Sequence, residues 1–385
     1  MQLFDLHETQ KAVASDIEDN FRRGFLPQSL LFSGPTGSSR LTGALDLSFM
    51  LLDDEKNRKL LKASQIVFIP SRNLEAEANA AMALYSKQRT NSSRIFLLQC
   101  VRKILFQYHS SLLDAYDKKT SSYFSQAEEI AAFLYDYDEE REYSEKEIKS
   151  LISFLKKSLT AAFINKGRKN PIATIDEIRC IQDWFSSGSD EKIAIIENVE
   201  KSTEGAKNSL LKMLEEPVEH SHIILISTNA QRLLQTILSR TRKFNFPALT
   251  ANKVTSFLKS RFNLYDEYQS FEAFFFLEGA SDEDKSLLDS ALSIFTSLVL
   301  GQTKALTRDE KENLFLSIEK VNSYHYFLEC VAKNISKAMI AGKIKPYDAQ
   351  IRMDIINKWV ENSDTFNLSQ RASLDGIIRE VQSVE

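Results

Sequence analysis

The chain has 385 residues, of which 43% are hydrophobic and 26% are charged, and its formal net charge is −4. A chain of this length and composition is expected to form two or three globular domains with a sizeable core. Its slightly acidic balance excludes nucleic-acid binding through a bulk basic field, so any contact with DNA would have to be local or shared with partners.

The N-terminal part predicts a phosphate-binding element. The stretch GPTGSSRLTG (residues 34–43) follows a short apolar run and precedes a helical pattern. Strand, glycine-rich loop and helix form the context that a phosphate-binding loop requires. The elements predicted up to residue 70 are a helix over 8–23 that ends at Gly24, a strand over 28–34, a helix over 41–52 and a buried strand over 65–70 that Pro70 closes.

Residues 73–169 predict a helical insertion. Ser144 and Glu147 have capping-box spacing, which indicates that a helix begins there. Gly167 is the expected end of this helix. The acidic run 135–142 before it is interpreted as a solvated loop, with a partner site as the alternative. The apolar face of the helix consists of Ile148, Leu151, Ile152, Leu155, Leu159 and Phe163.

From residue 173 onward strands and helices alternate. Thr174 and Glu177 have capping-box spacing and begin a helix. The elements that follow are a strand over 192–198, a helix over 203–217 that stops at Pro217, and a strand over 222–228. Because each strand is apolar throughout, the sequence predicts an α/β fold with a parallel sheet covered on both faces. From about residue 250 to the end the pattern is helical.

The predicted phosphate-binding loop departs from the full pattern G-x-x-x-x-G-K-[ST] at its last three positions. Ser39 has a Cβ where the backbone should approach phosphate closely, and Arg40 has a bulkier, planar head than the lysine it replaces. Leu41 has no oxygen to offer a magnesium ion. The degenerate loop comprises Gly34, Gly37, Ser38, Ser39, Arg40 and Leu41.

The second metal-binding element is degenerate as well. A working site needs an apolar strand that ends in Asp-Glu, whereas the strand over 192–198 ends in Glu197 and Asn198. Glu197 could still hold a metal, but the neutral amide of Asn198 cannot act as a base toward water. Three parts of the machinery for nucleotide hydrolysis are altered together, which predicts that this chain does not hydrolyse a nucleotide. The alternative, that 34–43 is only a turn, is opposed by the strand and helix that flank it.

Residues 207–217 and 222–246 resemble the clamp-loader branch of the AAA+ ATPases, and most closely the delta-prime and gamma/tau subunits of bacterial DNA polymerase III. Two further stretches, 26–35 and 175–179, match the same family in the right order. The resemblance covers most of 1–248 apart from the insertion. The matching residues are Asn208, Leu210, Leu211, Lys212, Leu214, Glu215, Glu216, Pro217, Thr236, Ile237, Ser239 and Arg240.

The resemblance implies roles for Arg240, Ser239 and Thr228. Arg240, with Ser239, stands where the family places an arginine finger that completes the ATP site of a neighbouring subunit; the alternative is a surface ion pair. Thr228 stands where the family has a polar nucleotide sensor. Independently of the resemblance, Glu215 and Glu216 lie in the last turn of a helix, where the macrodipole disfavours negative charge, which indicates a tertiary or functional use.

The resemblance also implies an architecture and partners. We expect an AAA+ domain over 1–248 with the insertion at about 73–169, a helical lid over 249–285 and an all-α collar over 286–385. The expected function is that of a delta-prime-like subunit that does not hydrolyse ATP, in a hetero-oligomer with gamma/tau and delta subunits that loads the sliding clamp onto primed DNA. An active gamma/tau-type ATPase and a stand-alone interaction protein are the alternatives.

The sequence also leads to expectations about cofactors and about location in the cell. Weak or no ATP binding is expected, and no zinc, because the four-cysteine module of most bacterial relatives is missing and Cys100, Cys180 and Cys330 are far apart. His220 and His222 are interpreted as surface residues, with metal ligands as the alternative. No apolar signal core or membrane-spanning run is found, which predicts a cytoplasmic protein. The basic stretches 167–171 and 240–243 are candidate phosphate contacts.

Overall fold

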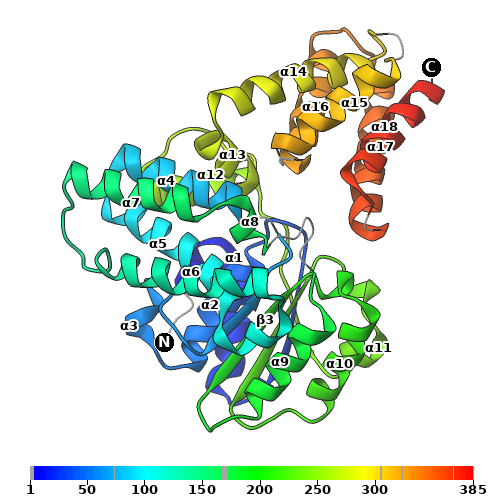
Figure 1. Cartoon of the computed structure of the whole chain (residues 1–385). Helices are drawn as coiled ribbons and strands as arrows, with labels where there is room; N and C mark the ends of the chain where they lie inside the picture. Colours follow the sequence, from blue (N-terminus) through cyan, green and yellow to red (C-terminus); the bar gives the residue numbers. More distant parts are fainter. Residues whose placement is uncertain are drawn as a thin grey trace. The chain divides into compact units, whose positions relative to one another are not determined.

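A five-stranded parallel sheet organises the first of the two units into which the chain folds (Figure 1). The computed structural model describes residues 4–72, 74–166, 172–303, 306–321, 324–366 and 368–384. The units are Met1–Phe271 and Glu272–Glu385. The strands are β1 (Ser29–Ser33), β2 (Ile66–Ile69), β3 (Lys192–Glu197), β4 (Ser221–Ser227) and β5 (Arg242–Asn245), in the spatial order β2-β3-β4-β1-β5.

The predicted α/β fold is confirmed, and four of the strands lie where the sequence places them. β1, β2 and β3 are buried at every position, as expected for strands covered on both faces. β5 was not predicted. It pairs in parallel with β1 along the edge of the sheet, and only Phe244 among its residues is buried. An edge strand that exposes charged residues lacks the apolar run by which the others are detected.

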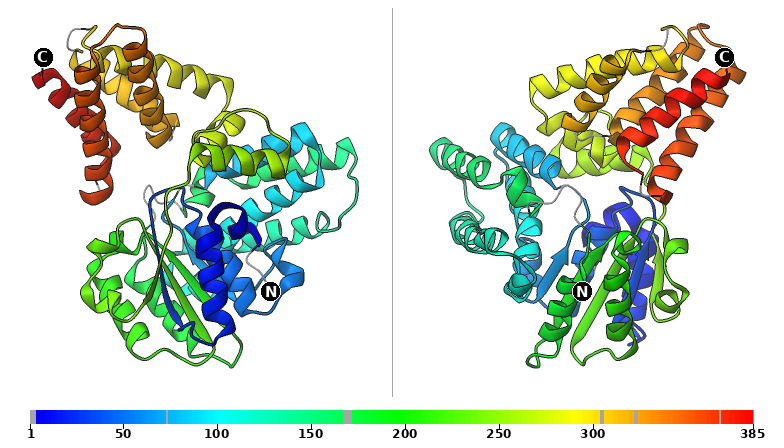
Figure 2. Two further views of the ribbon diagram at one scale, coloured as in Figure 1. Left: turned by 180° about the vertical axis from the view of Figure 1, so that it is seen from behind. Right: turned by 45° about the vertical axis from the view of Figure 1, so that its right-hand side comes forward.

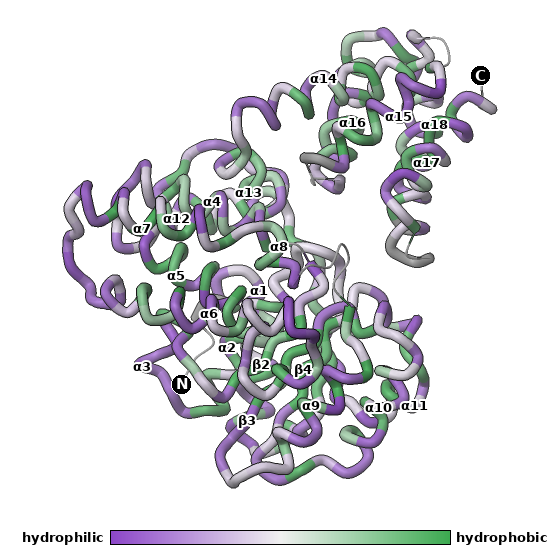
Figure 3. Tube along the Cα trace, in the orientation of Figure 1, coloured by the Kyte–Doolittle hydropathy of each residue, from purple (hydrophilic) through white to green (hydrophobic). Residues whose placement is uncertain are grey.

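Helices cover both faces of the sheet. Figure 2 shows α1 (Phe4–Arg22) and α2 (Arg40–Leu51) on one face, and α9 (Ile175–Phe185) and α10 (Glu204–Glu215) on the other. The hydrophobic residues concentrate in the strands between these layers (Figure 3). Two short helices, α3 (Glu55–Arg58) and α11 (Gln235–Leu238), complete this part of the unit.

The regular elements of the predicted insertion are all helical among its described residues. The insertion contains α4 (Glu75–Gln88), α5 (Asn91–Leu105), the 3₁₀ turns Phe106–Tyr108 and Ser110–Ala115, α6 (Lys118–Tyr135), α7 (Glu145–Ser158) and α8 (Ala161–Ile164). A loop separates α6 from α7, as expected for the acidic run. The capping boxes at Ser144 and Thr174 are both confirmed. The predicted extent of the helix that begins at Ser144 is wrong, because α7 ends at Ser158 and α8 is a separate short helix with Thr160 as its N-cap. Gly167 and the basic stretch 167–171 lie outside the described residues.

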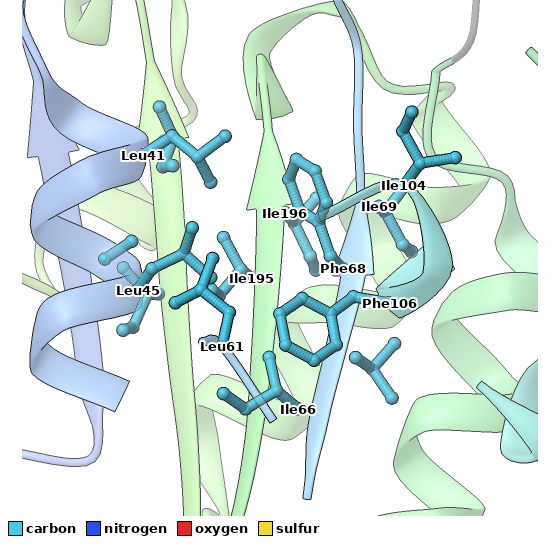
Figure 4. Close-up of a cluster of buried hydrophobic side chains, with 14 of the residues drawn as sticks. Leu41, Leu45, Leu61, Ile66, Phe68, Ile69, Ile104, Phe106, Ile195 and Ile196 are labelled. Carbon is cyan, nitrogen blue, oxygen red and sulfur yellow. The ribbon is translucent and has the colours of Figure 1, made fainter. Parts of the chain in front are cut away.

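The insertion shares its core with the sheet. Figure 4 shows Ile104 and Phe106 beside Phe68 and Ile69 of β2, the edge strand next to which the insertion begins. All four side chains are at most 6% exposed. Farther along, the ring of His109 lies 4.7 Å from that of Trp184 in α9. The insertion is therefore packed onto the unit along one edge.

The C-terminal part is all helical in its described residues, as predicted. α12 (Ala251–Phe262) belongs to the first unit, α13 spans Phe271–Gly279, and the second unit continues with α14 (Asp282–Val299), α15 (Arg308–Val321), α16 (Tyr324–Ile340), α17 (Pro346–Phe366) and α18 (Gln370–Val384). The second unit has a hydrophobic core of its own. The predicted domain boundaries at 248 and 285 stay predictions.

Close packing of α17 against α18 depends on one glycine. A Cβ on Gly376 would lie 2.3 Å from the ring of Trp359, so no other residue fits beside this tryptophan without a shift. The indole nitrogen of Trp359 donates a hydrogen bond of 2.8 Å to Glu380. Among the described residues, no helix is long and apolar enough to cross a membrane.

Candidate functional site

The predicted phosphate-binding loop lies at the carboxyl end of β1 and leads into α2. Gly37 and Ser39 both have left-handed backbone conformations, with φ of 76° and 63°. Ser39 is the N-cap of α2, but its side chain makes no capping hydrogen bond. The amide of Gly34 donates to the carbonyl of Ser227 on the neighbouring strand β4, at 3.2 Å. The chain thus retains the turn from strand to helix on which such loops are built.

Two glycines of this region are explained by packing against Phe246. A Cβ on Gly34 would lie 2.1 Å from the carbonyl oxygen of Phe246, and one on Gly43 would lie 3.0 Å from its ring. Gln10 fastens the loop from another side, because its amide nitrogen donates to the carbonyls of Ser38, at 3.1 Å, and Pro247, at 2.6 Å. The contacts with Phe246 and Gln10 fix the position of the loop.

Two of the three side chains at the degenerate positions of the loop are buried, those of Arg40 and Leu41. Arg40 is 4% exposed and Leu41 is 5% exposed. Figure 4 shows Leu41 projecting from α2 toward the sheet, on the same face of the helix as Leu45. Ser38 is buried too, and its hydroxyl has no hydrogen-bond partner among the described residues. The position that should offer a hydroxyl to magnesium is part of the hydrophobic core.

Glu197 ends β3 and is bound by two residues that follow β2. Its carboxylate forms an ion pair with Arg72 and accepts a hydrogen bond of 3.2 Å from the backbone amide of Ser71. The side chain of Glu197 is 2% exposed. Arg72 was not predicted from the sequence as a site residue. Its place directly after the predicted strand 65–70 was the available signal, because neighbouring parallel strands end at the same edge of a sheet.

A second buried ion pair lies within the insertion, between its first two helices. Glu77 of α4 pairs with Lys103 of α5, and the thiol of Cys100 donates to the same carboxylate at 3.4 Å. Burial alone would raise the pKa of Glu77, but the charges of Lys103 and Arg72 outweigh it and lower that pKa. Burial also raises the pKa of Cys100, so this cysteine is a neutral donor.

Thr228 contacts an acidic residue that was not predicted from the sequence as a site residue. Its hydroxyl and its backbone amide donate to Glu200, at 2.6 and 2.9 Å. Glu200 is 6% exposed, in a turn after β3. The chain reaches this turn through Asn198, whose backbone is left-handed with φ of 45°. The structure therefore brings the end of β3 and the end of β4 together through Glu200.

Arg240 lies on a partly exposed turn after α11. Its guanidinium is 2.8 Å from a carboxylate oxygen of Glu215 and donates to the carbonyl of Thr236 at 2.9 Å. The side chains of Arg240 and Glu215 are 33% and 49% exposed. Ser239 donates to the same carbonyl at 3.1 Å. The ion pair supplies a tertiary partner for Glu215, which accounts for an acidic residue at that helix end.

His220 and His222 lie beside Glu191, at 2.9 and 3.3 Å. The hydrogen bond to Glu191 raises the pKa of His220, whereas burial lowers that of His222. Within the described ranges, no group of three or more His, Cys, Asp or Glu side chains is arranged to hold a metal ion.

The residues at the loop and at the end of β3 do not fit a magnesium–nucleotide complex as they lie in this structure. Leu41 offers no oxygen and is packed in the core. One oxygen of Glu197 contacts Arg72 and the other contacts the amide of Ser71. A metal ion would have to displace one of these partners to reach the carboxylate.

Comparison with known proteins finds similarity to subunits of DNA polymerase III. Residues 107–250 match the family model described as DNA polymerase III, delta subunit. DNA polymerase III subunit tau of Bacillus subtilis is 30% identical over 172 residues, which cover 43% of this chain and 29% of the relative. Subunit delta-prime of Buchnera aphidicola is 34% identical over 97 residues, 24% of this chain and 30% of the relative. Subunit delta-prime of Bacillus subtilis is 41% identical over 76 residues, 19% and 23%.

The chain spans less than a third of the length of each of these relatives. The crystal structure of a gamma subunit-related protein from Thermotoga maritima aligns with 60% of this chain and 90% of its own, with 18% identity and a TM-score of 0.27. That likeness is too low to carry an argument about the fold, which here rests on the strand order and pairing described above.

Proposed function

We propose that this chain, a relative of the delta-prime, gamma and tau subunits of DNA polymerase III, is a delta-prime-like clamp-loader subunit that does not hydrolyse ATP. It assembles with gamma/tau and delta subunits, and Arg240 completes the ATP site of a neighbouring subunit. The complex loads the sliding clamp onto primed DNA. These partners and this activity extend to the chain what its relatives' names and the matched motifs indicate.

The observation that carries the proposal is the burial of Leu41. In a working loop a hydroxyl at this position binds the magnesium ion that bridges the phosphates. Here a leucine that is 5% exposed packs with the core between α2 and the sheet. Restoring a metal ligand would require a polar residue in that core. The strand–loop–helix element is then a scaffold, held by Gln10 and Phe246.

The position of Arg240 supports the role in a neighbouring site. Its ion pair and hydrogen bonds within the described residues are with Glu215 and Thr236 and not with the chain's own loop. An exposed ion pair of this kind contributes about 0–1 kcal/mol. The pair with Glu215 is therefore weak enough to be exchanged for a phosphate oxygen of a partner's nucleotide, to which a guanidinium binds well.

The test compares Arg240→Ala with Glu215→Ala in the complex reconstituted with its gamma/tau and delta subunits. Arg240→Ala is expected to lower the clamp- and DNA-stimulated ATPase rate by roughly tenfold or more, since an arginine finger contributes on the order of 10³–10⁵ at its own site. Glu215→Ala breaks the same ion pair but leaves the arginine, so the rate should stay near that of the wild type.

Equal losses in the two variants would mean that Arg240 acts only through its ion pair, and the finger would be rejected. ATP hydrolysis by the isolated chain that Glu197→Gln abolishes would favour the alternative, an active gamma/tau-type ATPase. Failure to associate with any clamp-loader subunit would favour a stand-alone interaction protein.

A further inference from the structure

We propose that Arg72 is the resident cation of the Glu197 carboxylate, and that helices α4 and α5 of the insertion hold it there. Glu197, Arg72, Glu77 and Lys103 form what we call the charge ladder. Through this ladder the insertion prevents a nucleotide-bound metal ion from reaching Glu197 at the end of β3. The inference rests on the proposed function, because it explains how a subunit that does not hydrolyse ATP keeps an acidic residue at this position.

Glu197 stands at the edge of the sheet where the loop begins, two strands away from it. It is in register with Ile226 of β4, and the next residue, Ser227, pairs with Ser33, which directly precedes the loop. Two strand spacings separate β3 from β1, or roughly 10 Å. The carboxylate therefore lies on the side of the sheet that a bound nucleotide would face.

Both oxygens of Glu197 have partners within the chain. Arg72 contacts Oε1, and the amide of Ser71 donates to Oε2 at 3.2 Å. The side chain of Glu197 is 2% exposed, whereas that of Arg72 is 40% exposed. A divalent cation from solution therefore cannot reach the carboxylate unless Arg72 or Ser71 moves.

Glu77 of α4, five residues after Arg72, forms an ion pair with Lys103 of α5, and its charge also acts on Arg72. The charges of Lys103 and Arg72 outweigh burial and lower the pKa of Glu77. Cys100 adds a hydrogen bond of 3.4 Å to Glu77. The ladder alternates two carboxylates with two cations, so it is neutral as a whole. A charge removed from such a set leaves its neighbour buried and uncompensated, which is costly.

The test uses the full-length chain and Mn²⁺ alone as the probe. Arg72→Ala should lower the thermal unfolding midpoint by on the order of 5 °C, because it leaves Glu197 buried without its cation. Mn²⁺ should then raise the midpoint of this variant, and the electron paramagnetic resonance signal of free Mn²⁺ should decrease on binding. Wild-type protein should show neither effect at the same metal concentration.

The control is Arg72→Ala combined with Glu197→Gln. This double variant should be more stable than Arg72→Ala and should not respond to Mn²⁺, because the unpaired charge is gone. If Arg72→Ala does not fold, recovery of folding in the double variant supports the proposal. The proposal would be overturned if neither variant folds, or if a folded Arg72→Ala does not respond to Mn²⁺. It would also be overturned if the wild type binds Mn²⁺ as well as Arg72→Ala does.

A second variant tests the role of the insertion. Glu77→Gln removes the charge of α4 that acts on Arg72, so it should loosen Arg72 and allow Mn²⁺ to bind at Glu197, though to a smaller extent than in Arg72→Ala. Glu142→Gln, at an exposed position outside the ladder, is the matched control and should not bind Mn²⁺. A folded Glu77→Gln variant that binds no more Mn²⁺ than the wild type would contradict the role of the insertion.

These measurements are made on the isolated chain, whereas the proposed function is tested through Arg240 in the complex. If Mn²⁺ stabilises Arg72→Ala but Arg240→Ala does not change a partner's ATPase rate, the charge ladder is supported and the arginine finger is rejected. If Mn²⁺ has no effect on Arg72→Ala but Arg240→Ala lowers that rate, only the charge ladder is rejected.

Discussion

At the residue scale, the loop glycines show how a motif position can be retained for packing. Gly34 belongs to the phosphate-binding pattern, yet in this chain its missing side chain makes room for the backbone of Phe246. Gly37 has open space around it and is needed only for its left-handed backbone. The two glycines of the pattern therefore have different physical causes here.

This difference predicts unequal effects of two substitutions. Gly34→Ala forces a backbone carbonyl to move and should reduce the free energy of unfolding by about 1–3 kcal/mol, as overpacking does. Gly37→Ala costs about 1–2 kcal/mol for the left-handed conformation alone. Urea unfolding followed by circular dichroism measures both. Gly34→Ala should in addition disturb the packing of Phe246. A Gly34→Ala variant as stable as the wild type would refute the close approach of Gly34 to the backbone of Phe246.

At the element scale, the start of α7 is fixed by side chains. Ser144 and Glu147 cap each other's backbone amides, and Arg141 donates to Glu147 at 2.7 Å. The hydrogen bond from Arg141, followed by those from Ser144, lowers the pKa of Glu147 from 4.5 to about 2. The first turn of α7 thus contains a carboxylate that stays ionised in moderately acidic solution.

The shifted pKa predicts a pH-dependent contribution to stability. The unfolded chain binds a proton at Glu147 more readily than the folded chain does, so the contribution is present above pH 4.5 and is lost as the pH falls toward about 2. Glu147→Gln keeps a capping side chain without the charge. It should be less stable than the wild type at pH 7, and the difference should shrink below about pH 4.5.

Urea unfolding at several pH values provides the measurement. Glu142→Gln, on the exposed loop before α7, should show no such convergence. A difference between Glu147→Gln and the wild type that stays constant down to pH 3 would rule out the ionised cap.

How much of the structure the sequence predicts depends on the element. Strands buried on both faces have continuous apolar runs, so β1 to β4 could be predicted. β5 escaped because three of its four residues are exposed. The turn from β1 into α2 was predictable from its glycine pattern, but Arg72 was not assigned to Glu197. That pairing depends on the register of two strands more than a hundred residues apart in sequence.

At the scale of the whole molecule, two separate cores imply two folding units. The first core comprises the sheet, its helices and the insertion, and the second is formed by helices α14 to α18 with Phe276 of α13. A domain with its own core is expected to fold alone. The close fit of Trp359 against Gly376 provides the second unit with specific packing as well as hydrophobic burial.

We therefore expect a fragment of residues 272–385 to be helical and to unfold cooperatively on heating. Circular dichroism measures both properties. Within the fragment, Gly376→Ala should lower the unfolding midpoint sharply, whereas Gly342→Ala, which meets no neighbouring atom within 4 Å, should lower it less. A fragment without helical structure would show that the second core needs the rest of the chain.

The chain has two tryptophans, Trp184 in the first unit and Trp359 in the second. Trp184 stacks on Phe185 and lies against His109, and Trp359 is pressed against a glycine and donates to Glu380. Each unit thus carries one fluorophore in a surrounding of its own. When either tryptophan is replaced by phenylalanine, the remaining tryptophan fluorescence reports on the other unit alone. The unfolding of each unit can therefore be followed separately in the intact protein without an attached dye.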